Sequence, residues 1–316
     1  MESGISITRR GILSSAGALG MAAAAGTTLG GALPAAGVAA YVGHSGDALI
    51  GKVKAPDLHV MSFNIRYDRE GTQPGQPDYW PERKPLVTEL VELEKPTILG
   101  VQEAEFGQLV SLEAGLGPKY RMLGFGRDGG AGGEYSSIFY DASRLEAVWW
   151  NQFWLSDTPD LIGSATWGNS VTRIVTWVRF RDLATGTEFL HVNSHFDHQS
   201  ENARVRSAEV VRSLIADTGL PAVFTADCNA AAEASASYTT LVTDGGLIDT
   251  WLAGTQLTPR VGTFPNYGTP SPTGNRIDWI LTTPGITVKE SAINTWTKDG
   301  RWPSDHTPVQ ALVRLP

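Results

Sequence analysis

The sequence predicts one α/β (α+β) domain over residues 57–316, built as a four-layer α/β sandwich of two packed mixed β-sheets flanked by helices. Short apolar runs rich in β-branched and aromatic residues recur along this stretch and are separated by Gly, Pro, Asp or Asn, which is typical of strands. Helical periodicity appears in fewer places between them. No repeat of fixed period and no Pro- or Ser-rich linker interrupts the stretch, so we expect a single domain.

The predicted strands alternate in polarity or are wholly apolar. They span residues 59–65, 98–102, 120–124, 136–140, 147–153, 172–181, 188–194, 222–226, 277–282 and 309–315. The predicted helices span residues 81–93, 106–116, 202–216 and 236–243. Pro81 suits the first helical position, and Gly219 with Pro221 ends the third helix.

Residues 1–40 have the pattern of a twin-arginine-type signal peptide. Arg9 and Arg10 precede an uncharged, Ala- and Gly-rich run over residues 14–33, and Val38-Ala39-Ala40 offers a small-residue cleavage site. We therefore expect an exported, extracellular protein with a flexible leader over residues 41–56. The alternative is a retained anchor, because the run is nearly long enough to span a bilayer, although its Gly and Ala content disfavours this. No later segment is apolar enough for a span in the mature protein.

Composition limits the classes of function. The 316 residues carry a formal net charge of -8, which argues against a broad basic surface for long duplex nucleic acid. The single cysteine, Cys228, excludes an internal disulfide, so stability must come from a hydrophobic core. We interpret Cys228 as a packed thiol and expect a monomer.

Three of the six histidines lie in the stretch Leu190 to His198. The preceding turn favours a strand, on which His191 and His195 share one face with Asn193. A zinc site needs more converging nitrogen or sulfur ligands than this, so the spacing does not favour one. We interpret His191 as structural and His195 as a proton-transfer residue, while His198 suits either substrate contact or loop structure.

Polar groups also accompany five of the predicted strands, at or near one end of each, and they predict a single lined pocket. They are Asn64 and Arg66, Glu103, Asp227 and Asn229, Asp278, and Asp305 with His306. Taken singly, each has a structural interpretation as a turn residue, a helix entry, a cap or an ion-pair partner. Together they supply hard oxygen ligands, amides and imidazoles, which suit Mg²⁺-assisted attack of water on phosphorus.

The order of these motifs resembles the endonuclease/exonuclease/phosphatase superfamily, which includes deoxyribonuclease I and exonuclease III. The motifs are Phe63-Asn64-Ile65-Arg66, Gln102-Glu103, Asn193-Ser194-His195, Asp227-Cys228-Asn229, Arg276-Ile277-Asp278 and Ser304-Asp305-His306. The chain also resembles a narrower bacterial group of secreted metal-dependent hydrolases. Its features here are Arg66-Tyr67-Asp68, Trp80 to Arg83, Gly126-Arg127-Asp128, Gly133-Glu134, Phe153 to Ser156, His195 to His198 and Ala203-Arg204.

The resemblance implies a metal site for Mg²⁺, with Mn²⁺ or Ca²⁺ as alternatives. Glu103 would be the main metal carboxylate, Asp305 would complete the site, and Asn64 would orient the phosphate or a water on the metal. Ala226 stands where the family commonly has glycine, and Cys228 where it has a bulky residue. Neither departure affects the expected metal chemistry.

The resemblance also implies the catalytic groups. Asp227 would position the attacking water beside Asn229, and His306, steadied by Asp278, would contact the phosphate. His195 would be the second catalytic imidazole. Glu134 is the acid that we expect to orient it.

Arginines are candidate phosphate clamps, because one guanidinium can donate two parallel hydrogen bonds. Arg66, Arg127 and Arg204 are predicted to bind substrate, and Arg173 suits this role or a solvated strand equally. The predicted substrate is a phosphate ester, either a phosphodiester or a phosphomonoester. Nucleic acid, a phosphoglycan and a lipid head group remain open, and a non-catalytic phosphate- or glycan-binding module is the alternative to an enzyme.

Overall fold

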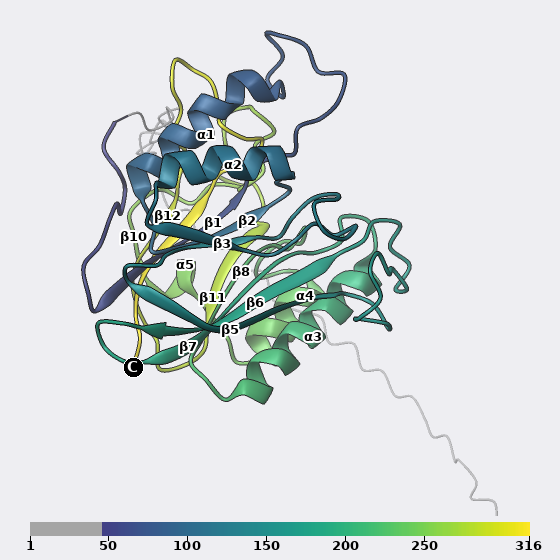
Figure 1. The fold of residues 1–316 in the computed structure, drawn as a ribbon, viewed down its shortest axis with the longest axis vertical. Helices are drawn as coiled ribbons and strands as arrows, with labels where there is room; N and C mark the ends of the chain where they lie inside the picture. The colour runs from purple at the N-terminus through teal and green to yellow at the C-terminus, as the bar shows by residue number, and fades with distance from the viewer. Residues whose placement is uncertain (1–45) are drawn as a thin grey trace, which may run out of the picture. The chain divides into compact units, whose positions relative to one another are not determined.

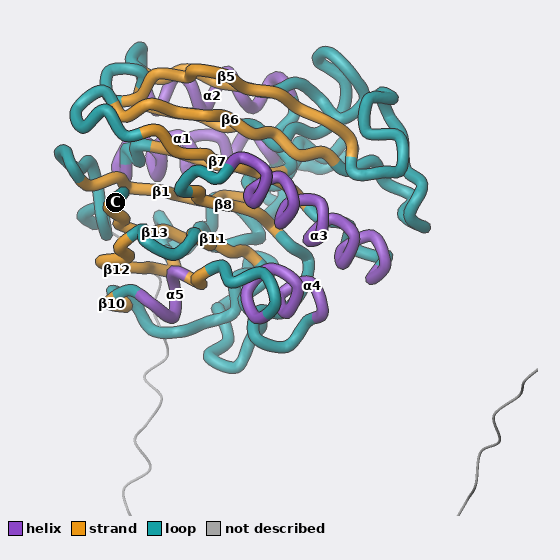
Figure 2. The backbone as a smooth tube through the Cα atoms, turned by 90° about the horizontal axis from the view of Figure 1, so that it is seen from below, coloured by secondary structure: helices purple, strands orange, loops and turns teal. Residues whose placement is uncertain are grey.

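The protein, seen in a computed structural model that describes residues 46–316, is a sandwich of two mixed β-sheets (Figures 1 and 2). One sheet has the order β10-β12-β13-β1-β2-β4-β3 and the other the order β5-β6-β7-β8-β11-β9. Each contains parallel and antiparallel pairs, because β1 runs parallel to β2 and β7 parallel to β8. The predicted fold class is confirmed.

The first sheet is made of β1 (Asp57–Asn64), β2 (Ile98–Gln102), β3 (Tyr120–Leu123), β4 (Ile138–Asp141), β10 (Thr255–Gln256), β12 (Thr287–Ile293) and β13 (Val309–Arg314). The second is made of β5 (Leu145–Trp154), β6 (Ile174–Asp182), β7 (Glu188–His195), β8 (Ala222–Asp227), β9 (Ile248–Asp249) and β11 (Asp278–Thr282). The helices are α1 (Trp80–Glu94), α2 (Phe106–Leu116), α3 (Glu201–Thr218), α4 (Ala236–Tyr238) and α5 (Thr250–Ala253), and a π-helical turn, η1 (Thr239–Thr243), extends α4.

Three buried apolar clusters hold the layers together. The first fills the space between the sheets, with Val60 of β1 and Phe180 of β6 among its members. The second joins α3 to its sheet through Val211 and Phe224. The third packs α1 and α2 on the other sheet and includes Leu90. Figure 1 shows α1 and α2 side by side, and Figure 2 shows α3 lying across the face of β7 and β8.

Three strands and one helix were not predicted. β12 carries Lys289 and Glu290 in its middle and has a register shift between Val288 and Glu290, so its polarity does not alternate cleanly. β9 and β10 have two residues each, and α5 has four, which is too short for a periodic signal.

Glu94, at the end of α1, holds the segment that precedes β1. Its carboxylate accepts hydrogen bonds from the backbone N–H of Leu49 at 2.9 Å and of Gly51 at 3.0 Å, and from Asn294 Nδ2 at 2.9 Å. Part of the predicted leader is thus attached to the domain. The predicted signal peptide lies outside the described residues, and no helix among residues 46–316 is long and apolar enough to span a bilayer.

Candidate active site

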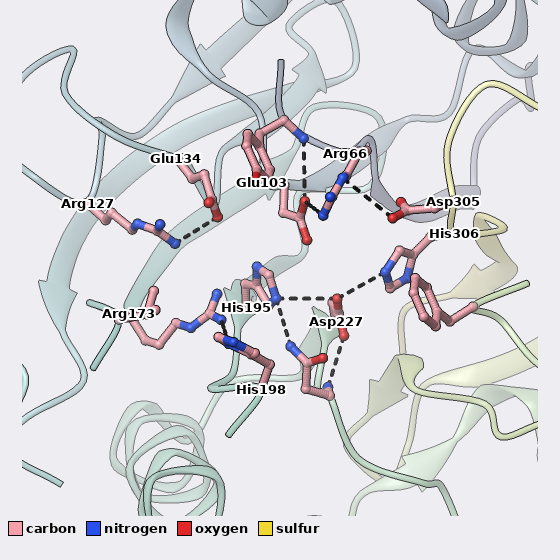
Figure 3. Close-up of a pocket in the computed structure, with 14 residues that line it drawn as sticks. Arg66, Glu103, Arg127, Glu134, Arg173, His195, His198, Asp227, Asp305 and His306 are labelled. Atoms are coloured by element: carbon pink, nitrogen blue, oxygen red, sulfur yellow. Dashed lines mark hydrogen bonds and ion pairs between the residues drawn. The ribbon is translucent and has the colours of Figure 1, made fainter. Parts of the chain in front are cut away.

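Strand register gathers the predicted polar groups at one end of the sandwich. In the first sheet Asn64 pairs with Gln102, so that Glu103 follows beside it. In the second sheet Asp227 lies between His195 of β7 and Asp278 of β11. The two sheets therefore present their functional side chains toward a common space, shown in Figure 3.

Three residues of this site have left-handed backbone conformations directly after a strand or one residue beyond it. The φ angles are 58° for Arg66, 63° for Glu103 and 47° for Asn229. Positive φ is uncommon outside glycine, and such residues cluster at functional sites, where surrounding contacts maintain the conformation. Here the conformation ends each strand and turns its side chain toward the site.

Asn64 joins the two sheets across the site. Its Nδ2 donates to Glu103 Oε1 at 2.8 Å and to Asp227 Oδ2 at 2.9 Å, while its Oδ1 accepts the backbone N–H of Arg66 at 3.0 Å. One amide thus holds two carboxylates in place.

Asp227 is almost fully buried, and burial raises its pKa to about 7. The negative charge of Asp278 acts in the same direction. The charge of His306 and hydrogen bonds from Asn229 and Asn64 oppose the increase. This carboxyl therefore titrates near neutrality, as suits a group that takes up and releases a proton.

His306 is held by Asp278, whose carboxylate lies 3.0 Å from Nδ1. Burial acts to lower the pKa of His306, but the charges of Asp278 and Asp227 outweigh it and keep the pKa well above its usual value. The ring is therefore a cation whose Nε2 lies 3.7 Å from Asp227 Oδ2. Phe264 packs against it with a centroid distance of 4.8 Å.

His195 has the opposite character. Burial, followed by the charges of Arg173 and Arg127, holds its pKa well below the usual value, so the ring is neutral. Nε2 lies 2.8 Å from Asn229 Nδ2 and 3.4 Å from Asp227 Oδ2. Because Asn229 Nδ2 is a donor, Nε2 is the acceptor and the proton is assigned to Nδ1. Two imidazoles with different protonation states flank one carboxylate.

Arg66 lies between two carboxylates that were both predicted as metal ligands. Its Nη1 is 3.5 Å from Glu103 Oε2 and its Nε is 3.6 Å from Asp305 Oδ2, with Asp78 Oδ1 at 3.4 Å from Nε. Asp305 is therefore in contact with the guanidinium of Arg66. Burial raises the pKa of Asp305.

The donor set in closest mutual proximity is formed by Glu103, Asp227 and His306. One ligand atom from each lies within 4.8 Å of the other two, and all three residues are buried. This set shares Glu103 with the predicted metal site. Of the other two predicted ligands, Asp305 lies beside Arg66, and Asn64 turns its amide nitrogen toward the carboxylates. Their roles as metal ligands stay predictions.

Glu134 and Arg127 form an ion pair of 2.7 Å on the loop between β3 and β4. Burial raises the pKa of Glu134 to about 7, against the charge of Arg127, with Glu103 raising it further. Among residues 46–316 no hydrogen bond joins Glu134 to His195, although both line the same space. The predicted Glu134–His195 pairing is therefore replaced by a pairing with Arg127.

A cavity of about 510 Å³ brings these groups together. Its lining includes all the predicted site residues except Asn64, Asp278 and Arg204. The first two lie directly behind it, in contact with Asp227 and His306. Arg204 lies away from it, because its place on α3 directs Nη1 to the backbone oxygen of Asp197 at 2.9 Å and Nη2 to Glu201.

The cavity also contains residues that the sequence left open or did not indicate. Arg173 and His198, for which two interpretations were open, both line it. Tyr67, Val171 and Phe264 line it without having been predicted. Tyr67 follows the first motif directly, which is a usable signal, whereas Val171 and Phe264 lie in loops with no distinguishing pattern.

Arg83 is a fully buried arginine that shapes the site from behind. Its guanidinium donates to the backbone oxygens of Ile65 at 2.7 Å, Tyr67 at 3.1 Å and Pro303 at 3.2 Å. It thereby ties the segment after β1 to the segment that carries Asp305 and His306.

Comparison with known proteins shows which family the chain is related to. The model of the endonuclease/exonuclease/phosphatase family matches residues 61–306. Two solved members of that family, from Bacteroides vulgatus and Bacteroides thetaiotaomicron, are each 35% identical, with TM-scores of 0.76 and 0.77. The match covers 82% of this chain in both cases, and 99% and 95% of those chains.

A mannosyl-6-phosphatase from Bacteroides thetaiotaomicron is also similar, with 35% identity and a TM-score of 0.74 over 81% of this chain and 99% of that one. No curated protein matches. The matched residues 61–306 include all six motifs of the site. The chain belongs to the endonuclease/exonuclease/phosphatase family of divalent-metal-dependent phosphoester hydrolases.

Proposed function

We propose that the protein is a secreted Mg²⁺-dependent phosphoesterase that hydrolyses its substrate by attack of water on phosphorus. The observation that carries this proposal is the position of Asp227. It is a buried carboxyl with a pKa of about 7, placed between a neutral and a charged imidazole at the base of a cavity lined by arginines. Such a group can orient water and accept its proton while cations stabilise the phosphoryl oxygens.

The chain's donors fit a divalent cation. Glu103 and Asp227 would hold it, since carboxylate oxygens are the ligands that Mg²⁺ prefers, whereas the protonated ring of His306 has no free lone pair for the ion. When bound, the cation would withdraw charge from the phosphoryl group. Glu103 is the member of the set to which we assign no other role, so it is the residue by which to test metal binding.

Asp227 orients the attacking water. Oδ1 is fixed by the backbone N–H of Asn229 at 2.9 Å, and Oδ2 by Asn64 Nδ2, so the carboxylate has one orientation. A single orientation holds the water in line with phosphorus, which lowers the entropic cost of the attack.

The imidazoles act on the phosphoryl oxygens. His306 carries the positive charge that Asp278 maintains and donates to an oxygen on which charge develops. His195, neutral and held by Asn229, has its Nδ1 proton available for a second oxygen or for the leaving group. Arg66 adds positive charge to the lining of the cavity.

The substrate class that we favour is a phosphorylated glycan or sugar, with a terminal phosphomonoester as the reacting group. A solved structure with 35% identity is a mannosyl-6-phosphatase. The chain's negative net charge does not suit a long nucleic acid. The cavity also pairs its arginines with carboxylates and so differs from a uniformly basic groove.

The test measures phosphate release from mannose 6-phosphate and p-nitrophenyl phosphate, and release of p-nitrophenol, of nucleotide fragments or of the head group from bis-p-nitrophenyl phosphate, DNA and phospholipids, with Mg²⁺ or with EDTA. We expect release from the monoesters with Mg²⁺, abolished by EDTA and by Glu103→Ala. Faster cleavage of DNA or of bis-p-nitrophenyl phosphate would mean that the substrate is a phosphodiester. No cleavage of any substrate by a folded protein would favour a binding module.

We also propose export by the twin-arginine route, on the pattern of residues 1–40. In a bacterial host with a functional twin-arginine pathway, the wild-type chain should appear outside the cytoplasm with a new N-terminus near Tyr41. Replacement of Arg9 and Arg10 by lysine should retain it inside the cell at full length. Export of that variant at the wild-type level would contradict the proposal.

A further inference from the structure

The wall of the cavity opposite His306 carries polar groups that the proposed hydrolysis does not use. It is formed by Arg127, Glu134, Arg173 and His198, and we call it the distal wall. Figure 3 shows these four side chains on the side of the cavity away from Asp305 and His306, with His195 between the wall and Asp227. Asp227 and this wall line the same cavity, so an ester whose phosphate lies at Asp227 has the wall within that cavity.

The loop between β3 and β4 is built to present Arg127 and Glu134 together. The backbone N–H of Arg127 donates to the backbone oxygen of Glu134 at 3.0 Å, and Trp154 Nε1 donates to the oxygen of Arg127 at 2.7 Å. A Cβ on Gly126 would lie 1.9 Å from the oxygen of Gly132, so the loop closes only with glycine there. The ion pair is therefore fixed by its own backbone.

Arg173 and His198 come from different strand ends and meet at the same wall. Arg173 is 5% exposed, and its Nη2 donates to His198 Nδ1 at 3.0 Å. Its buried Nε has no hydrogen-bond partner among the described residues, and the nearest carboxylate oxygen, Asp197 Oδ2, is 3.7 Å away. An unpaired buried donor costs free energy.

Each arginine of the distal wall has a carboxylate beside it. Arg127 is paired with Glu134, and Arg173 has Asp197 beside it. Among residues 46–316, no group donates a hydrogen bond to Oε1 of Glu134, and Nη2 of Arg127 donates none. A second phosphate would face the Glu134 carboxylate, and an apolar group would leave these donors and acceptors without partners. A hydroxyl group fits, because it accepts from a guanidinium and donates to a carboxylate.

We propose that the distal wall binds neighbouring hydroxyl groups on the alcohol part of the phosphate ester, so that Arg127, Glu134, Arg173 and His198 select a sugar or another polyol phosphate. This inference rests on the proposed function. Arg127 and Glu134 form one donor and acceptor pair of the wall. Arg173 and His198 extend the same donor and acceptor pattern.

The test compares two esters of similar shape, mannose 6-phosphate and cyclohexylmethyl phosphate, whose ring lacks hydroxyl groups. The purified wild-type protein should show a kcat/KM ratio of about 100 or more in favour of the sugar, since hydrogen-bonding sites strongly reject analogues that lack the partner group. Glu134→Gln and Arg127→Gln should each lower this ratio by about tenfold or more, mainly through KM for the sugar phosphate.

The matched control is Glu146→Gln, which removes the carboxylate of an exposed ion pair with Arg181, neither of which lines the cavity. Its ratio should equal that of the wild type. A wild type without preference for the sugar would overturn the proposal. So would an equal loss on both esters in the Glu134 and Arg127 variants, because that would place these residues in phosphate binding or catalysis.

Failure of the proposed function can be told apart from failure of this inference. If the wild type hydrolyses neither ester, the proposed monoester substrate class fails. Calorimetric binding of the two esters to Asp227→Asn then decides the role of the wall. Tighter binding of mannose 6-phosphate, lost in the double variant with Glu134→Gln, would support it, and equal binding of the two esters would overturn it. Thermal unfolding of each variant shows whether it is folded. If Arg127→Gln does not fold, Arg127→Lys takes its place in the comparison.

Discussion

Asp227 is the residue on which most contacts of the site converge, from Asn64, Asn229, His195 and His306. Replacement by asparagine keeps the size of the side chain but removes the proton acceptor. We expect Asp227→Asn to lower kcat by about two orders of magnitude or more, and His306→Ala to do the same. Steady-state kinetics on the best monoester measures this.

Asp57→Asn is the control for Asp227→Asn, because Asp57 pairs with Arg314 and Lys289 at the protein surface. Its kcat should not change. Turnover near the wild-type level in pure Asp227→Asn would mean that another group accepts the proton, and the site as proposed would be wrong.

Glu134 provides a prediction about pH. Its pKa is raised to about 7 by burial, so between its unfolded value and pH 7 the folded state binds more protons than the unfolded state. Stability must then fall as pH rises through this range. Glu134→Gln resembles the protonated form and should gain stability relative to wild type between pH 4.5 and pH 8, by up to about 3 kcal/mol at 1.36 kcal/mol per pKa unit.

Urea unfolding of both proteins at several pH values measures the difference. Glu146→Gln, which is exposed, should show no comparable trend with pH. A constant difference between wild type and Glu134→Gln across this range would contradict the raised pKa.

At the scale of elements, the two sheets lie in close contact where β2 faces β7 and β8. A Cβ on Gly100 would lie 2.2 Å from Thr225 Oγ1 and 2.7 Å from Asn193 Oδ1. Asn193 in turn bonds the backbone oxygens of Val101 and Ser137 at 2.9 Å each. These contacts fix the distance between the sheets, and with it the distance between Glu103 and Asp227.

Gly100→Ala should therefore destabilise the protein by about 1–3 kcal/mol, as overpacking in a filled interior does. The control is Gly107→Ala on α2, where an added Cβ meets nothing within 4 Å. That variant should be as stable as the wild type or more stable by up to about 1 kcal/mol. Chemical denaturation compares the two, and equal stabilities would show that the sheets can separate at no cost.

At the scale of the whole molecule, a bound cation should stabilise the fold. Buried carboxylates that repel one another are costly, and a divalent ion at Glu103 and Asp227 would offset that cost. With free Mg²⁺ at 100 times its Kd, the gain is about 2.7 kcal/mol, which corresponds to a rise of several degrees in Tm. EDTA should reverse it.

Calorimetric unfolding scans measure this shift, and the same scans on Glu103→Ala should show little dependence on Mg²⁺. If the Tm of the wild type does not change with Mg²⁺, the ion does not bind at millimolar concentration. A shift of equal size in both proteins would place the ion elsewhere.

The sequence alone determined the fold class, ten of the strands and the residues at their ends. This was possible because apolar alternation is local and because polar groups after apolar strands stand out. Prediction from the sequence failed for β12, where Lys289 and Glu290 interrupt the apolar alternation, and for elements of two to four residues.

Only the tertiary structure decided which of the predicted residues meet. Arg66 contacts both Glu103 and Asp305, Glu134 pairs with Arg127, and Arg204 turns toward Asp197 outside the cavity. These partners come from different strands and loops, so their distances depend on sheet register and on how the two sheets pack. Periodicity along one strand shows which face a side chain occupies, but it carries no information about what lies opposite.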